Sequence, residues 1–596
     1  MTKPILFVSV ILAAVVSSNA GYIQDILSSV NSKYDFIVIG AGSAGSVVAN
    51  RLSANPNWTV LALEAGIHEN FFNDIPVIAW FESKYPYDWG FKTEKLPNAC
   101  LSTIDGTCLL ASGRAVGGTS VTNFMVYNRG NKEDYNGWAA LGNNGWGYED
   151  VLPFFKKSEN CQKCIDIDPD YHSNDGPLNI EPPGWESPLV DLFIKAGEEL
   201  GYSHNDPDGK QQLGFSKVRA TERRGRRCST ATAFIKPILN RSNFNLQSGA
   251  RVTKILIDPT TKKAHGVEYI KYGIKHTVHA TKEIILSAGT IMSPQLLMTS
   301  GVGPQDHLTE KGITCLKNSK VGYNLQDHVG VVLQALFVNE SVTFTDVDFF
   351  KPQNWYQYLV NGKGVLTLPG GSEALAFVKS KYAPQDRDYP DLQLVLGAIS
   401  FNQLTFALLG NSAGVPTKLY NQVFAPHVGT PSFGINPFVM RPKSRGRVSL
   451  KTSNSLDNPK IDTNYFSETE DVDVLVEGLK LSIQLAESDP FKRYNTRPNT
   501  TPFPGCEAMT FGSDEYWRCA VRQVGASGQN PVGTCKMGPS SDEDAVVGPS
   551  LKVHGIKGLR VADASIMPNI IAGNIFAAVV MIGEKAADMI AKDWSV

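Results

Sequence analysis

The chain has 596 residues, of which 42% are hydrophobic, 19% charged and 10% aromatic. This is the composition of a folded globular protein and excludes a mostly disordered or fibrous chain. With 56 Lys and Arg against 58 Asp and Glu, the net charge is −2, so we do not expect nucleic acid as a partner.

The N-terminus has the order of a secretory signal. Lys3 precedes an apolar run over residues 5–16, and the small residues Ser18 and Ala20 follow it. The run is shorter than the roughly 20 residues of a membrane span, which disfavours the alternative of an uncleaved anchor. We therefore expect a signal peptide over residues 1–20, a secreted (extracellular) product, and no membrane association of the mature chain.

A strand, a glycine turn, a helix and a second strand are predicted next. Residues 36–39 and 59–63 are short apolar strands, and residues 46–53 are a helix candidate. The turn between the first strand and the helix has the pattern G-x-G-x-x-G and consists of Gly40, Ala41, Gly42, Ser43, Ala44 and Gly45.

This context predicts a dinucleotide site. Gly40 permits the tight turn, Gly42 lets the backbone approach a pyrophosphate, and Gly45 lets the helix pack on the strand. The helix N-terminus offers free N–H groups to the phosphates. Glu64, about 20 residues further on, can accept the ribose hydroxyls of an adenosine and disfavours NADP. The motif by itself does not separate FAD from NAD.

The nine cysteines are consistent with a secreted protein. Spacing allows short disulfide loops for Cys100 with Cys108 and for Cys506 with Cys519. Cys161 and Cys164 form a C-x-x-C pair typical of redox or zinc sites, but no second pair or nearby His pair accompanies it, so a structural disulfide is preferred and no metal is expected. Sequons for N-glycosylation are present at Asn57, Asn240, Asn339 and Asn499.

Further elements are predicted along the chain. Strands are expected at 252–257, 283–287 and 559–561, and a helix at 581–591. Residues 348–438 are rich in Phe, Tyr, Leu, Gly and Pro and lack one clear period. We interpret this region as part of a second domain built over the first.

Five more motifs, in a fixed order, carry a family resemblance. They are Gly113–Asn123 (GRAVGGTSVTN), Gly289–Pro304 (GTIMSPQLLMTSGVGP), Asn324–His328 (NLQDH), Pro531–Gly538 (PVGTCKMG) and Val561–Pro568 (VADASIMP). With them, the chain from Tyr34 to about Ile590 resembles the glucose–methanol–choline (GMC) oxidoreductase family. The cysteine-bearing loops resemble its secreted insect branch, which includes glucose dehydrogenases and the salicyl alcohol oxidases of leaf beetles.

The resemblance implies an α/β fold, α+β overall, in which a Rossmann-like FAD-binding domain is interleaved with a mixed-sheet substrate-binding domain. It implies an N-terminal region over 34–330 with FAD-binding segments and the start of the substrate domain. It also implies a substrate-domain segment over 331–440 and a C-terminal region over 441–590 with the substrate sheet, the catalytic position and the closing FAD segment.

The expected cofactor is FAD, bound noncovalently. The residues implied to hold it are Gly40, Gly42, Ser43, Ala44, Gly45, Glu64, Val116, Gly118, Asn123, Val252, Asp563 and Ala564.

The match breaks at the catalytic pair. The family base is usually a His directly before the Pro-Val-Gly-Thr-Cys-Lys-Met-Gly run, and this chain has Asn530 there. The second polar position falls on Asn574 and is retained, but Ile575 and Phe576 replace a polar stretch. A neutral amide does not accept a proton as imidazole does. His427 is the alternative base only if the second domain brings it close.

Two functions follow. The first is a secreted FAD-dependent enzyme that oxidises the CH–OH group of a small-molecule alcohol to an aldehyde or ketone, with oxygen or a quinone as acceptor. The second is a catalytically weakened or inactive FAD-binding paralogue. The apolar replacements, with Phe124 and Phe401 if the fold brings them near Phe576, favour an aryl or terpenoid alcohol over a sugar, because sugar recognition needs many polar contacts.

Overall fold

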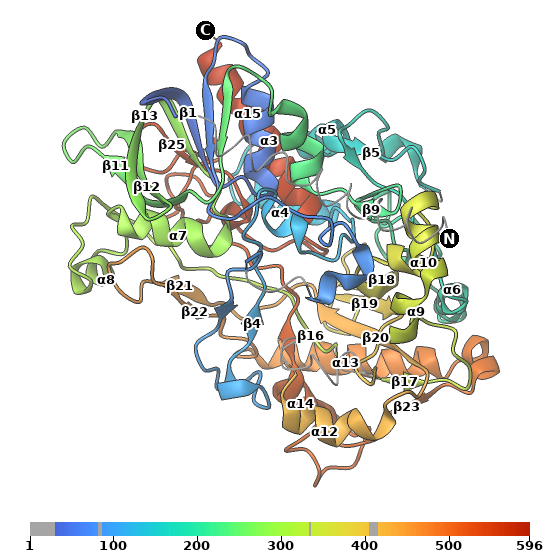
Figure 1. The fold of residues 1–596 in the computed structure, drawn as a ribbon. Coiled ribbons are helices and arrows are strands. Elements are labelled where there is room, and N and C mark those ends of the chain that lie inside the picture. Colours follow the sequence, from blue (N-terminus) through green and yellow to red (C-terminus); the bar gives the residue numbers. More distant parts are fainter. Residues whose placement is uncertain (1–29, 82–85, 166, 333–334, 404–414, 596) are drawn as a thin grey trace.

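The computed structural model describes residues 30–81, 86–165, 167–332, 335–403 and 415–595, so the expected signal peptide over 1–20 lies outside the described residues. Figure 1 shows two sheets in different halves of the molecule. One lies in the half that holds the C-terminus, and the other lies below it, above helix α13.

The first sheet has seven strands and is built around the predicted dinucleotide unit. The order is β10-β2-β1-β13-β12-β11, and β25 pairs with β13 beside β12. The bounds are β1 Lys33–Ile39, β2 Val60–Leu63, β10 Phe244–Gln247, β11 Arg251–Ile257, β12 Ala264–Lys271, β13 Ile274–Leu286 and β25 Leu559–Val561. Strands β10, β2, β1, β13 and β25 run parallel, and β12 is antiparallel to both β11 and β13.

Three helices from distant parts of the sequence pack against this sheet or against one another. Helix α3 (Ser43–Leu52) connects β1 to β2, α7 (Gly289–Thr299) follows β13, and α15 (Phe576–Trp594) packs along α3 near the C-terminus (Figure 1). Parallel strands joined by helices bury both faces, which explains why β2 and residues 36–39 of β1 are apolar and fully buried. The predicted elements are thus confirmed, with β13 and α15 longer than expected.

The second sheet has eight antiparallel strands, ordered β23-β17-β20-β19-β18-β7, with the short strand β16 paired to both β20 and β24. The bounds are β7 Gly214–Lys217, β16 Val329–Gly330, β17 Leu336–Phe337, β18 Ser372–Val378, β19 Leu392–Gly397, β20 Ser432–Val439, β23 Arg497–Pro498 and β24 Ala526–Ser527. Helix α13 (Thr469–Ala486) packs against β20.

Shorter elements surround the sheets. Among the described residues, the remaining α-helices are α4 Lys132–Ala140, α5 Tyr148–Ser158, α6 Leu189–Glu199, α8 Gln305–Glu310, α9 Asp346–Phe350, α10 Pro352–Tyr356, α12 Thr417–Val423 and α14 Asp514–Val524. The remaining strand pairs are β3 Phe91–Lys92 with β4 Leu109–Leu110, β5 Glu159–Asn160 with β6 Leu178–Asn179, β8 Glu222–Arg223 with β9 Arg226–Arg227, β14 Val302–Gly303 with β15 Lys317–Asn318, and β21 Arg447–Ser449 with β22 Lys460–Asp462.

The two sheets are interleaved in sequence, as the fold class predicted. Strand β7 of the second sheet lies between β2 and β10 of the first, and β25 of the first comes after every strand of the second. The predicted region 348–438 supplies β18, β19 and β20. The three predicted disulfides are present, and Cys228, Cys315 and Cys535 are unpaired.

Candidate functional site

The turn between β1 and α3 forms a cradle of backbone N–H groups. Helix α3 begins at Ser43, and its N-cap Gly42 offers no side-chain cap to the first turn, which also has no acidic residue. A Cβ at Gly45 would lie 1.9 Å from the carbonyl oxygen of Gly40, so only glycine allows this turn to close. Because the first turn of α3 has no side-chain cap, its backbone N–H groups have no side-chain acceptor. Such a helix start is suited to bind an anionic group.

Glu64 lies directly behind this turn, at the end of β2. Its carboxylate accepts hydrogen bonds from the backbone N–H groups of Ala41 (2.9 Å) and Gly66 (2.8 Å). Burial raises the pKa of Glu64 to about 7, although both N–H groups oppose the shift. The carboxylate is therefore held at the position that the sequence predicted for it.

Three segments that are distant in sequence meet at the turn. A Cβ at Gly118 would lie 2.6 Å from the Cα of Gly42, and the N–H of Gly117 donates to the carbonyl of Ala41 (2.7 Å). A Cβ at Gly42 would meet only the Cα of Gly118, at 3.6 Å, and one at Gly289 would meet nothing within 4 Å. Half-buried backbone at Gly42 and Gly289 therefore has room beside it, which fits the close approach of a nucleotide pyrophosphate.

The remaining predicted cofactor residues lie around the same place. Asp563 follows β25, and its carboxylate accepts from Gly289 N–H (2.9 Å) and Ser293 Oγ (2.6 Å) at the start of α7, while Ala564 accepts from Gly533 N–H (3.3 Å). Val252 lies near the start of β11, two residues after Ala250, whose N–H donates to the Glu64 carbonyl.

The stretch with Val116 and Asn123 joins the cradle to the rest of the site. The N–H of Val116 donates to the carbonyl of Ile67 (3.0 Å). Asn123 is held by the buried Arg227, whose Nη1 donates to its backbone carbonyl (2.7 Å) and to its side-chain oxygen (2.9 Å). Arg227 was not predicted from the sequence. It belongs to the basic run 223–227, and such a run usually indicates a solvent-exposed hairpin.

The structure brings the two predicted catalytic positions together. The side-chain oxygen of Asn530 accepts from the N–H of Ile575, the residue after Asn574 (3.2 Å), and its Nδ2 donates to the carbonyl of Gly528 (2.7 Å). Asn530 is only 8% exposed. Each of the two amide atoms retains one further hydrogen-bonding position.

Asn574 is held from both domains. Its side-chain oxygen accepts from Asn128 Nδ2 (2.7 Å) and from Gln393 Nε2 (3.5 Å), and Gln393 lies on β19 of the second sheet. A Cβ at Gly573 would lie 2.0 Å from Oδ1 of Asn128, so glycine is needed beside Asn574. Neither Asn128 nor Gln393 is marked by a sequence motif, and only the fold places them here.

His427 does not lie at this site. Its ring packs on Phe337 (4.8 Å between centroids) and its Nε2 lies 3.4 Å from Oγ1 of Thr501. Phe337 pairs with the start of β20, whereas β16, which pairs with the segment before Asn530, joins the end of β20. The hypothesis that His427 replaces the base is therefore not supported.

The expected aromatic group is present only in part. Trp80 lies between Phe124 (4.7 Å between centroids) and Phe401 (5.6 Å). Phe576 instead packs in the core of the FAD-binding domain, at the start of α15. The expectation that Phe576 joins these aromatics is not supported, because Phe576 belongs to a different hydrophobic cluster from Phe124 and Phe401.

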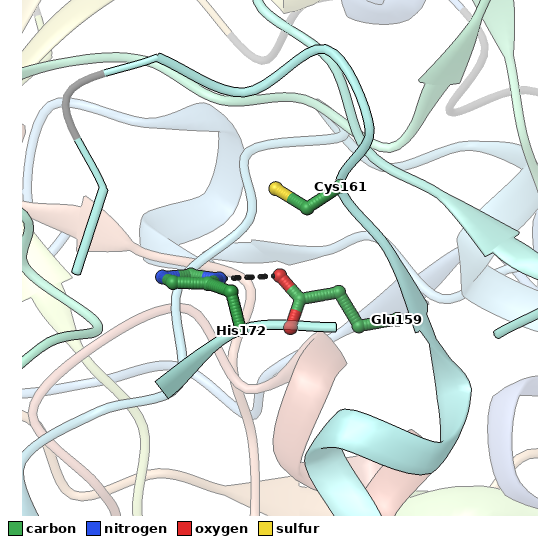
Figure 2. A group of neighbouring side chains, drawn as sticks. All are labelled: Glu159, Cys161 and His172. Carbon is green, nitrogen blue, oxygen red and sulfur yellow. Dashed lines mark hydrogen bonds and ion pairs between the residues drawn. The ribbon is translucent and has the colours of Figure 1, made fainter. Parts of the chain in front are cut away.

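Among the described residues, one group of side chains has the spacing of metal ligands: Glu159, Cys161 and His172. Figure 2 shows the hydrogen bond between Glu159 and His172, which is 2.6 Å long, and Cys161 beside them. Cys161 is bonded to Cys164, and Glu159 also pairs with the buried Arg129. All three side chains are thus engaged within the protein.

No helix in the described part of the chain is long and apolar enough to cross a membrane.

Sequence comparison agrees with the geometry. Sequence models of GMC oxidoreductases match residues 34–330 and 442–583. The chain is 42% identical over 567 residues to a glucose dehydrogenase (FAD, quinone) of Drosophila melanogaster, which covers 94% of this chain and 87% of that protein. It is 36% identical over 569 residues to an alcohol dehydrogenase (acceptor) of Pseudomonas putida. That alignment covers 94% of this chain and 96% of the bacterial protein.

Structural comparison points the same way. A structure of formate oxidase from Aspergillus oryzae aligns with a TM-score of 0.82 at 27% identity and covers 95% of this chain and all of that one. The sequence motifs, the interleaved sheets and the nucleotide cradle all agree with these matches. The chain belongs to the GMC oxidoreductase family and is an FAD-dependent oxidoreductase similar to the insect glucose dehydrogenases.

Proposed function

We propose that this protein is a secreted enzyme that oxidises the CH–OH group of a small-molecule alcohol to an aldehyde or ketone. In this proposal FAD is held by the glycine turn Gly40–Gly45, Glu64, Val116, Gly118, Asn123, Val252, Asp563 and Ala564. Bound FAD supplies the hydride acceptor, and oxygen or a quinone then takes up the electrons.

The observation that carries the proposal is the meeting of Asn530 and Asn574 at the junction of the two domains. Asn530 bonds to Ile575 N–H, and Asn574 bonds to Gln393 of the substrate sheet. Two polar amides between the flavin-binding segments and the second sheet can orient a substrate hydroxyl. Because neither amide takes up a proton at neutral pH, the hydroxyl proton leaves to water in this proposal, and turnover is slow.

For the substrate we propose an aryl or terpenoid alcohol. Phe124 follows the flavin-side residue Asn123 directly, and its ring meets Trp80, which in turn meets Phe401. Aromatic rings gathered at this place favour an apolar substrate, because a sugar would leave polar groups without partners.

One observation favours the second function, a weakened or inactive FAD-binding paralogue. Both polar atoms of the Asn530 side chain are already engaged with backbone groups, of Gly528 and Ile575. A side chain whose two polar atoms are both bonded to backbone groups would stabilise the structure and would not act on a substrate. This alternative keeps FAD binding and predicts no reduction of the flavin by alcohols.

One experiment separates these functions. The purified protein with bound flavin is mixed without oxygen with benzylic alcohols, allylic terpenoid alcohols and glucose, and the oxidised flavin absorbance is followed. We expect bleaching by the benzylic or allylic alcohols. Efficient bleaching by glucose alone would contradict the substrate class, and bleaching by none would favour the inactive paralogue. Oxygen or a quinone is then added to the reduced protein to identify the acceptor.

A further inference from the structure

The motif Asn324–His328 lies between the two segments that carry the candidate catalytic residues. On one side, Gln326 exchanges hydrogen bonds with Pro568 and Ile570, and His328 Nε2 lies 2.9 Å from the carbonyl of Ile571. These residues lead directly to Asn574. The other side of the motif contacts the segment that carries Asn530, and there the contact is made by a buried carboxylate.

That carboxylate belongs to Asp327. Its Oδ1 accepts from the backbone N–H of Asn530 (2.8 Å), and its Oδ2 accepts from Ser527 Oγ (2.5 Å) and from the hydroxyl of Tyr465. The side chain is almost fully buried, with 3% exposure. The backbone N–H of His328 also donates to it, and all of these donors are neutral, so the charge of Asp327 is held by hydrogen bonds rather than by an ion pair.

The bond to Asn530 stabilises a strained turn. Gln529, directly before Asn530, has a left-handed backbone with φ of +62°, which is uncommon for a residue other than glycine. The N–H of Gln529 donates to Ser527 Oγ (2.9 Å), which in turn donates to Asp327. The carboxylate therefore holds both ends of the turn 527–530, and through Asn530 it reaches the N–H of Ile575 beside Asn574.

We infer that Asp327 is the positioning residue of this site: its buried carboxylate, which is hydrogen-bonded to protein groups, holds the backbone at residue 530 so that the side chain there faces the residues next to Asn574. The inference rests on the proposed function for its catalytic consequence but not for its structural one. Because the contact is to a backbone N–H, the same anchor acts on whichever side chain occupies position 530.

The protonation of Asp327 predicts a pH-dependent step in the rate, which a contact that serves only to hold the fold together would not produce. Burial raises the pKa of Asp327 to about 6, against the hydrogen bonds from Ser527 and Tyr465. Of the titratable neighbours, burial raises the pKa of Tyr465 well above its ordinary value, and burial lowers that of His328 to about 4. Between about pH 5.5 and 7.5 both neighbours keep one charge state, so a step near pH 6 reports Asp327.

The first test does not depend on turnover. Amide hydrogen exchange at Asn530 is measured by mass spectrometry in the holoenzyme, in Asp327→Ala and in Asp327→Asn. We expect exchange about tenfold or more faster in Asp327→Ala and near the original rate in Asp327→Asn, which keeps an acceptor. Asp391→Ala is the matched control, because Asp391 is also buried and accepts from one backbone N–H (2.8 Å) and one serine hydroxyl (2.5 Å), both of Ser380. Unchanged exchange at Asn530 in Asp327→Ala, or an equal increase in Asp391→Ala, would overturn the inference.

The second test uses flavin reduction in the chain that keeps Asn530, so that no imidazole at this position titrates in the same pH range. We expect a rate constant that falls below about pH 6, loss of this step in Asp327→Asn, and at least a tenfold lower rate in Asp327→Ala with little change in KM. If Asp327→Ala does not fold, Ser527→Ala and Tyr465→Phe, which each remove one donor to the same carboxylate, should shift the step. The same pH step in Asp327→Asn as in its parent would overturn the inference. Absence of flavin reduction in every variant would count against the proposed function, while the exchange test would still decide the role of Asp327.

Discussion

The side-chain oxygen of Asn530 accepts a hydrogen bond from the backbone N–H of Ile575, at 3.2 Å. Position 530 therefore faces the residue directly after Asn574, although the two segments are 45 residues apart in sequence. Under the proposed function, a basic nitrogen at position 530 would be the group that takes up the proton of the substrate hydroxyl.

Replacing Asn530 by His should therefore accelerate flavin reduction. A general base contributes roughly 10²–10⁴ in rate, so we expect a gain of at least about tenfold, with a rate that rises as the imidazole loses its proton. The measurement is anaerobic stopped-flow absorbance with the best alcohol of the panel. Asn530→Gln, which keeps an amide and adds no base, is the control and should show no gain. An equal gain in both variants would contradict the role assigned to this position.

Gly573→Ala should disturb the position of Asn574. The new Cβ would lie 2.0 Å from Oδ1 of Asn128. Nδ2 of the same Asn128 side chain donates to Oδ1 of Asn574. We expect a loss of about 1–3 kcal/mol in the free energy of unfolding, measured in urea, and slower flavin reduction. Gly137→Ala in α4 is the control, since a Cβ there meets nothing within 4 Å and alanine favours the helix. Normal flavin reduction in Gly573→Ala would argue against a role for the Asn128–Asn574 pair.

Glu64 should make the flavin-free protein less stable as the pH rises. In the folded chain burial raises its pKa to about 7, from an ordinary value of 4.5, so the folded state binds the proton more tightly than the unfolded state between these values. The free energy of unfolding should thus fall across pH 4.5 to 7, by at most about 3 kcal/mol from this group.

The test is urea unfolding of the flavin-free protein at several pH values. Glu64→Gln should flatten the slope in this window relative to the unmodified chain, and Glu198→Gln, at an exposed position of α6, should leave it unchanged. Identical slopes in Glu64→Gln and in the unmodified chain would show that this carboxyl does not titrate there.

His172 should have the opposite effect on stability. Burial disfavours its charged form, but hydrogen bonds to Asp206 (2.8 Å) and to Glu159 (2.6 Å; Figure 2) outweigh burial and raise the pKa. The stabilisation is complete below the unfolded value of about 6.5 and is lost as the pH rises through the folded value. His172→Gln should therefore cost a few kcal/mol at pH 6 and less at pH 9. Thermal unfolding across this range tests it, with His276→Gln on exposed β13 as the control.

Glycosylation should discriminate among the four sequons if the chain is secreted. Asn57, Asn240 and Asn339 are exposed, whereas Nδ2 of Asn499 donates to the carbonyl of Val423 (2.9 Å), which a glycan would displace. We expect glycans at some of the exposed sites and none at Asn499, measured by glycosidase treatment and peptide mass spectrometry after expression in insect cells. A glycan at Asn499 of the folded protein would contradict this prediction, and intracellular, unglycosylated protein would contradict secretion.

Much of the fold is predictable because it depends on short-range patterns. The apolar runs at 36–39, 59–63 and 559–561 become β1, β2 and β25 of one sheet. The prediction for 283–287 captures only the end of β13, which begins at Ile274. Residues 274–279 are mostly exposed and polar, so their strand conformation comes from pairing with β12 and not from local periodicity.

The amino-acid sequence by itself determined the dinucleotide turn, the family and the absence of the usual histidine at position 530, because each depends on residues that are adjacent or regularly spaced. Only the tertiary structure decided which side chains surround that position. Asp327, Asn128 and Gln393 reach Asn530 and Asn574 from three separate segments, while Phe576 belongs to the core of the FAD-binding domain. Contacts of this kind depend on strand pairing and domain packing across hundreds of residues, so no local sequence pattern predicts them.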